Sequence, residues 1–375
     1  MNMLYFILPI ILMSMISIYL YYYISRIVRS LNVNIKRRRV KLIIIGIVAL
    51  IIYFSLIDFG TGLVVILHII TMSLLMDFIN YILKLISKRK DVAFNRWNKV
   101  YNLRIIPVIL TIIILVYGYW NINNIVQKDY TVYTNKAIRA EGYRIAMISD
   151  LHYGNVMNKN KLEKACSEID KVEPDIVVLC GDIVDEKTGL EQMQEAVEIL
   201  GNIKSKLGIF FVYGNHDDAR YSKIPSYTKE KLKDELISNN IKVLVDQNYN
   251  INDDFVIIGR DDEGFSKEEG RKSSEELISD VNKNKFILLL DHQPSEINKN
   301  SLLGYDLQLA GHTHKGQIWP IGLISDVFNF NELEYGYKRI GNYGVIVSSG
   351  ISGWNYPVRT GSKSEYLVID IKGEG

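Results

Sequence analysis

Five short polar motifs in the second half of the chain hold most of the residues that could bind a metal ion. In chain order they are Ser149-Asp150-Leu151-His152, Gly181-Asp182, Gly214-Asn215-His216-Asp217, Asp291-His292-Gln293-Pro294 and Gly311-His312-Thr313-His314. Five of the six histidines of the chain lie in these motifs. Imidazole and carboxylate ligands together suit Mn²⁺, Fe²⁺ or Zn²⁺ better than Mg²⁺ or Ca²⁺. The residue types therefore predict a site for divalent ions of this kind.

Each motif follows a short, β-branched, apolar run that is typical of a buried strand. We expect strands near residues 143–149, 175–180, 208–213, 255–258, 285–290, 305–310, 344–348 and 366–371. Helical patterns lie between several of them, at 159–172 and 190–206. Buried strands that alternate with helices indicate an α/β domain whose sheets are covered on both faces.

The spacing inside the motifs predicts that their side chains converge. Residues i and i+2 of a strand point to the same side, so Asp150 with His152, and His312 with His314, can face one locus beyond the sheet. Glycines before Asp182, Asn215 and His312 would let the backbone turn sharply there. Each motif is weak alone, because a single Gly-Asp is usually a turn. Five in this order, each at a strand end, favour one shared site.

This ordered set of motifs resembles the calcineurin-like metallophosphoesterase superfamily, over about residues 143–371. The resemblance implies a four-layer α/β/β/α sandwich with two metal ions between the sheets, which would be Mn, Fe or Zn. It assigns the first ion to Asp150, His152 and His314, the second to Asn215, His292 and His312, and a bridging position to Asp182. A hydroxide shared by the ions would attack a phosphodiester or pyrophosphate.

The resemblance also suggests roles for residues that do not bind metal. His216 would protonate the leaving group or stabilise charge in the transition state. Asp185 matches a position that often orients this histidine in the superfamily, although a turn carboxylate is an equally good interpretation. Glu186 stands where protein Ser/Thr phosphatases usually have arginine, which argues against phosphoprotein substrates.

Within the superfamily, the motifs are most similar to membrane-anchored phosphodiesterases of the YkuE type. Those proteins usually continue the last motif with two glycines before a glutamine, and this chain has Lys315-Gly316-Gln317 instead. The substitution leaves the substrate preference open. Lys315 and Arg359 are candidate phosphate contacts, although exposed cationic side chains usually belong to the general surface.

The first third of the chain has a different composition from the rest. Residues 1–129 carry 15 basic and 4 acidic residues, for a net charge of +11, and the remainder has a net charge of −9. Apolar runs predict transmembrane helices at 4–24, 42–57, 62–82 and 105–120. The second and fourth runs are short, so Lys41 and Arg104 would need to snorkel. We expect a transmembrane region over 1–122, a polar connector over 123–142 and a catalytic domain over 143–375.

Loop charges predict the orientation of these spans. Basic residues crowd the loops after the first and third spans, whereas the turn at 58–62 has none. Positive loops stay in the cytoplasm, so a multi-pass protein of the cell membrane is expected, with both termini and the catalytic domain outside. A cleaved signal peptide fits the first run less well, because Tyr21-Tyr22-Tyr23 stands where small residues would be expected.

Several other residues fit structural roles. Asp77 is interpreted as an interfacial residue and His68 as a packed or helix-pairing residue. Cys166 and Cys180 are expected to be free packing residues, although a bridge between them is conceivable. Two cysteines exclude a disulfide scaffold. The only strong net positive charge lies between the apolar segments, so no nucleic-acid partner is expected.

The sequence thus predicts a membrane-anchored, two-metal phosphoesterase that acts on a phosphorylated small molecule or a lipid-linked substrate. A membrane transporter or sensor with a non-hydrolytic outer domain is the alternative, and metal-dependent turnover would separate the two. A pseudo-enzyme would be expected to lack a ligand, whereas all seven positions are filled. The oligomeric state is not predicted.

Overall fold

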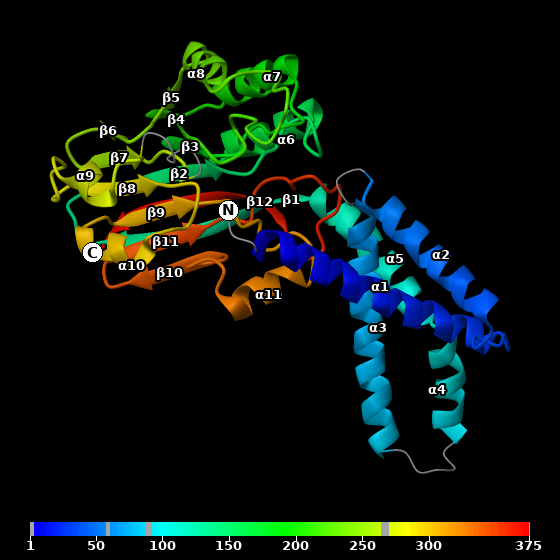
Figure 1. Cartoon of the computed structure of the whole chain (residues 1–375). Helices are drawn as coiled ribbons and strands as arrows, with labels where there is room; N and C mark the ends of the chain where they lie inside the picture. The colour runs from blue at the N-terminus through cyan, green and yellow to red at the C-terminus, as the bar shows by residue number, and fades with distance from the viewer. Residues whose placement is uncertain (1–3, 58–60, 87–91, 264–269, 375) are drawn as a thin grey trace. The chain divides into compact units, whose positions relative to one another are not determined.

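The computed structural model of the chain describes residues 4–57, 61–86, 92–263 and 270–374. It divides into two compact units, Met1–Tyr117 and Gly118–Gly375 (Figure 1). The first is helical, and the second contains all twelve strands that the described residues form. The boundary falls inside a helix, so the last residues of that helix belong to the second unit.

The helices of the first third are α1 (Leu4–Ser30), α2 (Arg38–Ser55), α3 (Thr61–Ile86), α4 (Val92–Leu103) and α5 (Ile105–Ile122). Within the part of the chain that the structure describes, three helical segments are long and apolar enough to cross a membrane: Ile10–Ser30, Thr61–Ile86 and Ile105–Ile122. The expected second span is part of α2, whose first turn contains Arg38, Arg39 and Lys41. These cations leave its apolar part short. Most of the expected turn at 58–62 lies outside the described residues.

Asp77 is the centre of a polar cluster within the helical unit. Its carboxylate lies 3.1 Å from Arg26 Nη1 and 2.7 Å from Arg104 Nη2, and it accepts a hydrogen bond of 2.5 Å from Tyr101. Arg104 is almost completely buried, so the prediction that it snorkels is wrong. Its guanidinium instead contacts the carboxylate of Asp77 and the hydroxyl group of Tyr101. Tyr101 belongs to α4, a helix within the region expected to be only a loop.

The second unit contains two six-stranded mixed sheets (Figure 1). One has the order β1-β12-β2-β3-β4-β5 and the other β10-β11-β9-β8-β7-β6. The strands of the first sheet are β1 (Ile125–Thr134), β2 (Tyr143–Ile148), β3 (Ile176–Cys180), β4 (Gly208–Val212), β5 (Ile241–Val243) and β12 (Ser364–Gly373). Those of the second are β6 (Gln247–Asn250), β7 (Phe255–Gly259), β8 (Phe286–Leu290), β9 (Leu307–Ala310), β10 (Gly336–Ile340) and β11 (Tyr343–Val347).

Side-chain alternation along the strands produces three apolar layers. In β2, Ile145 and Met147 face the core between the two sheets, whereas Ala146 and Ile148 face the opposite side. That outer face packs on α6 (Lys159–Lys171), α7 (Leu190–Gly201) and α8 (Lys229–Ser238). The outer face of the other sheet packs on α9 (Ser274–Ile278) and α10 (Ile297–Leu303). Helices therefore cover both outer faces of a pair of sheets, giving four layers (Figure 1).

The segment expected to be a polar connector, 123–142, contains strand β1. This strand pairs in parallel with β12 along ten residues at the edge of the first sheet. Gln127, Lys128 and Asp129 are exposed, and Val132 and Thr134 are buried. An edge strand with one solvent-exposed face has a polar composition like that of a linker. For this reason the sequence predicted a connector where the structure has a strand. Cys166 and Cys180 are both free and buried, as predicted.

Candidate metal centre

The predicted ligands lie just beyond the strands, in loops with unusual backbone conformations. Strand β2 ends before Asp150 and β9 ends before His312, so the i and i+2 rule for strands does not apply to these pairs. Instead, five of the seven predicted ligands have positive φ: Asp150 (53°), His152 (44°), Asp182 (53°), His312 (70°) and His314 (50°). Such conformations are rare outside glycine and concentrate at functional sites, where the surrounding fold maintains them.

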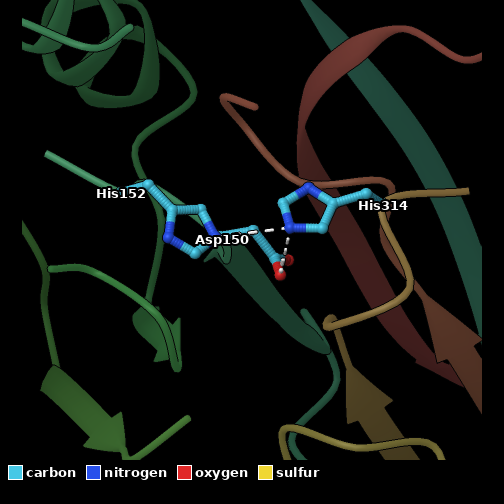
Figure 2. Close-up of side chains that lie close together, drawn as sticks. All are labelled: Asp150, His152 and His314. Carbon is cyan, nitrogen blue, oxygen red and sulfur yellow. Dashed lines mark hydrogen bonds and ion pairs between the residues drawn. The ribbon is translucent and has the colours of Figure 1, made fainter. Parts of the chain in front are cut away.

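The first group of predicted ligands is Asp150, His152 and His314, which lie together in Figure 2. His314 Nε2 is 3.6 Å from Asp150 Oδ1 and 3.3 Å from His152 Nε2. The ligand atoms of the three side chains all lie within 4.8 Å of one another. Asp150 and His152 are fully buried. This is a compact set of one carboxylate and two imidazoles, of the size that a metal ion requires.

The second group contains Asp182, His292 and His312, again with ligand atoms within 4.8 Å of one another. Asp182 Oδ2 lies 3.1 Å from His292 Nε2 and 3.9 Å from His152 Nε2. Asp182 thus contacts both groups, as a bridging ligand would. His292 Nδ1 donates to the carbonyl of Cys180 at 2.8 Å, which leaves Nε2 free to coordinate.

Unpaired ligand atoms indicate that these residues fit metal ions. Among the described residues, Asp150 Oδ2 and Asn215 Oδ1 are buried without a hydrogen-bond partner. Leaving such atoms unpaired in a protein interior costs about 1–3 kcal/mol each. Asn215 precedes His216, whose backbone N–H donates to Asp182 Oδ1 at 2.9 Å, so it borders the second group. A cation in the first group would provide a partner for Asp150 Oδ2, and one in the second group could take Asn215 Oδ1 as a further ligand.

Glycines permit close packing around the two carboxylates. A Cβ atom on Gly214 would lie 2.2 Å from Asp182 Oδ1, and one on Gly311 would lie 2.5 Å from Asp150 Oδ2. Neither glycine has the left-handed backbone that we expected from a sharp turn. Their role is to leave space, since any side chain would displace a ligand carboxylate. Gly181 is the exception, with φ of +80°.

Asp217, to which the sequence assigned no role, connects two of the ligand loops. Its buried carboxylate accepts hydrogen bonds from the backbone N–H groups of Asp182, Ile183, Val184 and Gly214, at 2.6–3.3 Å. Burial and the charge of Asp182 raise the pKa of Asp217 to about 7. Its position in the Gly-Asn-His-Asp motif was the only signal in the sequence. It is a positioning residue for the loop that contains Asp182.

The carboxylate that contacts His216 is not the predicted one. His216 Nδ1 lies 2.7 Å from Glu186 Oε1, whereas Asp185 Oδ2 lies 3.4 Å from His152 Nδ1. The prediction that Asp185 orients His216 is therefore wrong. Burial lowers the pKa of His216, but Glu186 and the charge of Asp182 outweigh it and raise the pKa to about 9. The rings of Tyr221 and Trp354 flank His216, with centroids at 5.2 and 5.3 Å.

The two candidate phosphate contacts differ from expectation. Arg359 is fully buried, and its guanidinium donates to the carbonyl groups of Ser349 and Lys363 at 2.7 and 2.6 Å. Its Nη2 also lies 3.4 Å from His314 Nδ1. Arg359 therefore supports a metal-binding loop and is not placed to contact a phosphate. Lys315 lies above the ring of Tyr335, with Nζ 4.9 Å from the centroid.

Comparison with known proteins identifies the family. The calcineurin-like phosphoesterase family matches residues 143–316. A metallophosphoesterase of Aquifex aeolicus is 30% identical over 254 residues, which cover 66% of this chain and 92% of that protein. The chain belongs to the calcineurin-like metallophosphoesterases. This family uses a dinuclear metal site, and the two ligand groups described above correspond to such a site.

Two further relatives bear on the predicted subgroup. A transmembrane protein with a metallophosphoesterase domain from Danio rerio is 26% identical over 308 residues, covering 78% of this chain and 68% of that protein. The metallophosphoesterase YkuE of Bacillus subtilis is 26% identical over 241 residues, covering 62% of this chain and 80% of that protein. The resemblance to YkuE is thereby confirmed. The apolar helices and the transmembrane relative together indicate a membrane protein.

Proposed function

We propose that this metallophosphoesterase is a membrane-anchored, two-metal enzyme that hydrolyses phosphodiester or pyrophosphate bonds. The observation that carries the proposal is the position of Asp182 between the two groups, together with the unpaired, buried oxygen atoms of Asp150 and Asn215. Asp150, His152 and His314 would hold one ion, and Asn215, His292 and His312 the other. Mn, Fe and Zn are the ions that this mixture of imidazole and carboxylate suits.

When bound, two such ions polarise phosphoryl oxygens and lower the pKa of a water molecule at the site. The protein contributes the remaining groups. His216 is adjacent to the ligand Asn215, and its Nδ1 is occupied by Glu186, so Nε2 remains to contact the phosphoester. Glu186 favours the protonated imidazole, which allows His216 to donate a proton to the leaving oxygen or to stabilise negative charge.

A four-span topology with the catalytic domain outside the cytoplasm is part of the proposal. Asp77 near the end of α3 contacts Arg26 near the end of α1, so both helix ends lie on the same side. Helix α2 lies between them in sequence and packs against both, with Gly62 of α3 close to Ser55. A return of α2 across the bilayer would account for this arrangement. Snorkelling of Arg38, Arg39 and Lys41 would compensate for its short apolar part.

Hydrolysis of bis(p-nitrophenyl) phosphate by the purified full-length protein, stripped and reloaded with Mn²⁺ or Zn²⁺, tests this function. We expect metal-dependent turnover that falls by about a thousandfold in Asp182→Asn and in His216→Ala. Asp370→Asn is the matched control. It makes the same change at a carboxylate of β12 that pairs with Arg144 and belongs to neither ligand group, so this variant should retain activity. Near-normal turnover by Asp182→Asn would refute the two-metal assignment. Ligand binding without any turnover would favour the sensor alternative.

A further inference from the structure

Helix α11 (Ile321–Phe328) exposes apolar side chains instead of burying them. Leu323, Ile324, Val327 and Phe328 are 56%, 43%, 73% and 66% exposed. Phe330 follows at 69%, with its ring stacked on that of Phe328 at a centroid distance of 6.0 Å. A contiguous exposed apolar patch on a protein surface usually marks a contact with a partner or a membrane.

Helix α11 is amphipathic, but its polar face packs on the domain and its apolar face is exposed. At 100° per residue, Leu323, Ile324, Val327 and Phe328 lie on one face, and Gly322 and Ser325 lie on the other. Ser325 is buried and donates a hydrogen bond to Glu334. Gly322 packs against Gly316, since a Cβ on Gly316 would lie 2.2 Å from the Gly322 backbone. Small and polar residues therefore attach α11 to its domain, and its apolar face points away from it.

Hydrogen bonds connect the start of α11 to the last turn of α5. The backbone N–H of Trp319 donates to Thr360 Oγ1 at 3.0 Å. One residue earlier, the N–H of Arg359 donates to the Gly118 carbonyl at 3.0 Å, and Asn121 Nδ2 donates to the Arg359 carbonyl at 2.8 Å. All of these residues belong to the second unit. Helix α11 thus begins beside the end of an apolar helix.

The end of α5 has the composition of a membrane interface. Tyr119 and Trp120 are exposed there, and such amphipathic rings concentrate at the level of the lipid head groups. Beyond them, Asn121 is buried in the domain by its bonds to Arg359 and Ser362. These features would place the bilayer surface near residue 120, beside the start of α11.

The segment that contains α11 is also connected to the metal centre. The loop 315–320 joins the predicted ligand His314 directly to α11, and Thr313 donates a hydrogen bond to the Glu334 carbonyl at 2.7 Å. Ser362, next to the Arg359 loop, donates to the His314 carbonyl at 2.9 Å. The metal-binding loop is therefore supported by the two segments that we place at the bilayer surface.

We propose that α11 and Phe330 insert their apolar face into the bilayer surface and hold the metal centre against it. The consequence for substrate, which rests on the proposed phosphoesterase function, is that the enzyme acts on phosphoesters of lipids embedded in that surface. Helices of this kind lie in the interface with the apolar face about 5–10 Å deep. Four large apolar side chains on one face, beside an aromatic helix end, match that geometry.

Fluorescence quenching in the full-length protein tests the docking directly. Cys166 and Cys180 are buried, so a cysteine at Val327→Cys can be labelled selectively with bimane. The protein is reconstituted into phosphatidylcholine vesicles with or without doxyl-labelled lipid. Ile237→Cys is the matched control. Ile237 is 55% exposed and lies on α8, which packs on the outer face of the first sheet. We expect strong quenching at 327 and none at 237.

Absence of quenching at 327 would overturn the proposal. Efficient disulfide formation between the unlabelled Val327→Cys residues of two copies under mild oxidation would also overturn it, because the face would then be a dimer contact. Neither result depends on whether the protein hydrolyses anything. Docking can therefore fail or succeed separately from the proposed function.

The substrate class is tested with two chromogenic diesters that share one leaving group, methyl and hexadecyl p-nitrophenyl phosphate, the latter in phosphatidylcholine vesicles. In the Leu323→Glu/Val327→Glu variant, we expect the ratio of hexadecyl to methyl turnover to fall about tenfold. Ile237→Glu should preserve the ratio. An unchanged ratio in the double variant would refute the lipid assignment. If the wild type hydrolyses neither ester, the phosphoesterase proposal fails, and the quenching result still decides the docking.

Discussion

At the scale of single residues, two neighbouring carboxylates serve different histidines. Glu186 contacts His216, which does not belong to either ligand group, whereas Asp185 contacts His152, which belongs to the first. The two interactions support different steps. Glu186 contacts Nδ1 of His216, the side chain that we propose contacts substrate, and Asp185 contacts a predicted metal ligand.

Substitutions at these carboxylates should therefore have different effects. We expect Glu186→Gln to lower kcat by about tenfold and to leave the metal content intact. Asp185→Asn should weaken metal binding by about 10–100-fold, with activity restored at higher metal concentration. Metal titration followed by activity and by elemental analysis of each variant distinguishes them. Rescue of Glu186→Gln by excess metal would contradict the assignment.

The sequence could not separate Asp185 from Glu186. Adjacent residues in a loop point in different directions, and which one faces His216 depends on backbone angles that composition does not report. Arg359 was misjudged for a related reason: arginine is usually exposed, but here three loop carbonyls solvate its buried guanidinium. Six of the seven predicted ligands were easier to bring together, because histidines and carboxylates that follow successive strands gather at the carboxyl ends of the two sheets.

At the scale of elements, close contacts between loops determine the shape of the ligand groups. Gly214 approaches Asp182 so closely that a methyl group would overlap with its carboxylate. We expect Gly214→Ala to lower metal affinity by about 10–100-fold without unfolding the domain. Gly189→Ala is the matched control, since a Cβ there would meet its nearest neighbour at 3.5 Å. Equal metal affinity in both variants would show that the close approach is unimportant.

Asp175, just before β3, connects the ends of several strands. It accepts hydrogen bonds from the Arg144 backbone N–H at 2.8 Å and from Lys206 at 3.1 Å, and it forms an ion pair with Arg139 at 2.5 Å. Burial alone would raise its pKa, but these donors outweigh burial and lower it. The ionised form is therefore the one that the fold stabilises.

This depressed pKa predicts a pH-dependent contribution to stability. The contribution is present above the pKa of the unfolded chain, about 4, and is lost as the pH falls through the lower pKa of the folded state. We expect Asp175→Asn to reduce the free energy of unfolding by about 1–3 kcal/mol at pH 7 and by much less near pH 3. Denaturant unfolding of full-length protein at both pH values measures it. A pH-independent difference would contradict the ion-pair account.

Most strands and the two predicted helices of the domain follow from local periodicity, and the elements that were missed have specific reasons. Strand β1 is polar because one of its faces is exposed, and β10 is an edge strand of the same kind. Helix α11 has its apolar residues on the exposed side, so its pattern does not identify the buried face. In α4, asparagines and two basic residues interrupt the apolar ones, so the segment resembled a charged loop.

At the scale of the whole molecule, the proposed topology can be tested by labelling. Single cysteines at Asn34→Cys, in the loop after α1, and at Ile237→Cys, on the domain surface, are treated with an impermeant maleimide. In right-side-out vesicles we expect labelling at 237 and protection at 34, and the reverse in inverted vesicles. Labelling of both positions from the same side would contradict the four-span topology. The buried native cysteines keep the background low.

The central claim is that seven dispersed side chains hold two metal ions. Anomalous diffraction from crystals soaked in Mn²⁺ tests it most directly. We predict two peaks, one among Asp150, His152 and His314 and one among Asn215, His292 and His312, with Asp182 between them. A single peak elsewhere, or none within these groups at saturating Mn²⁺, would contradict the account.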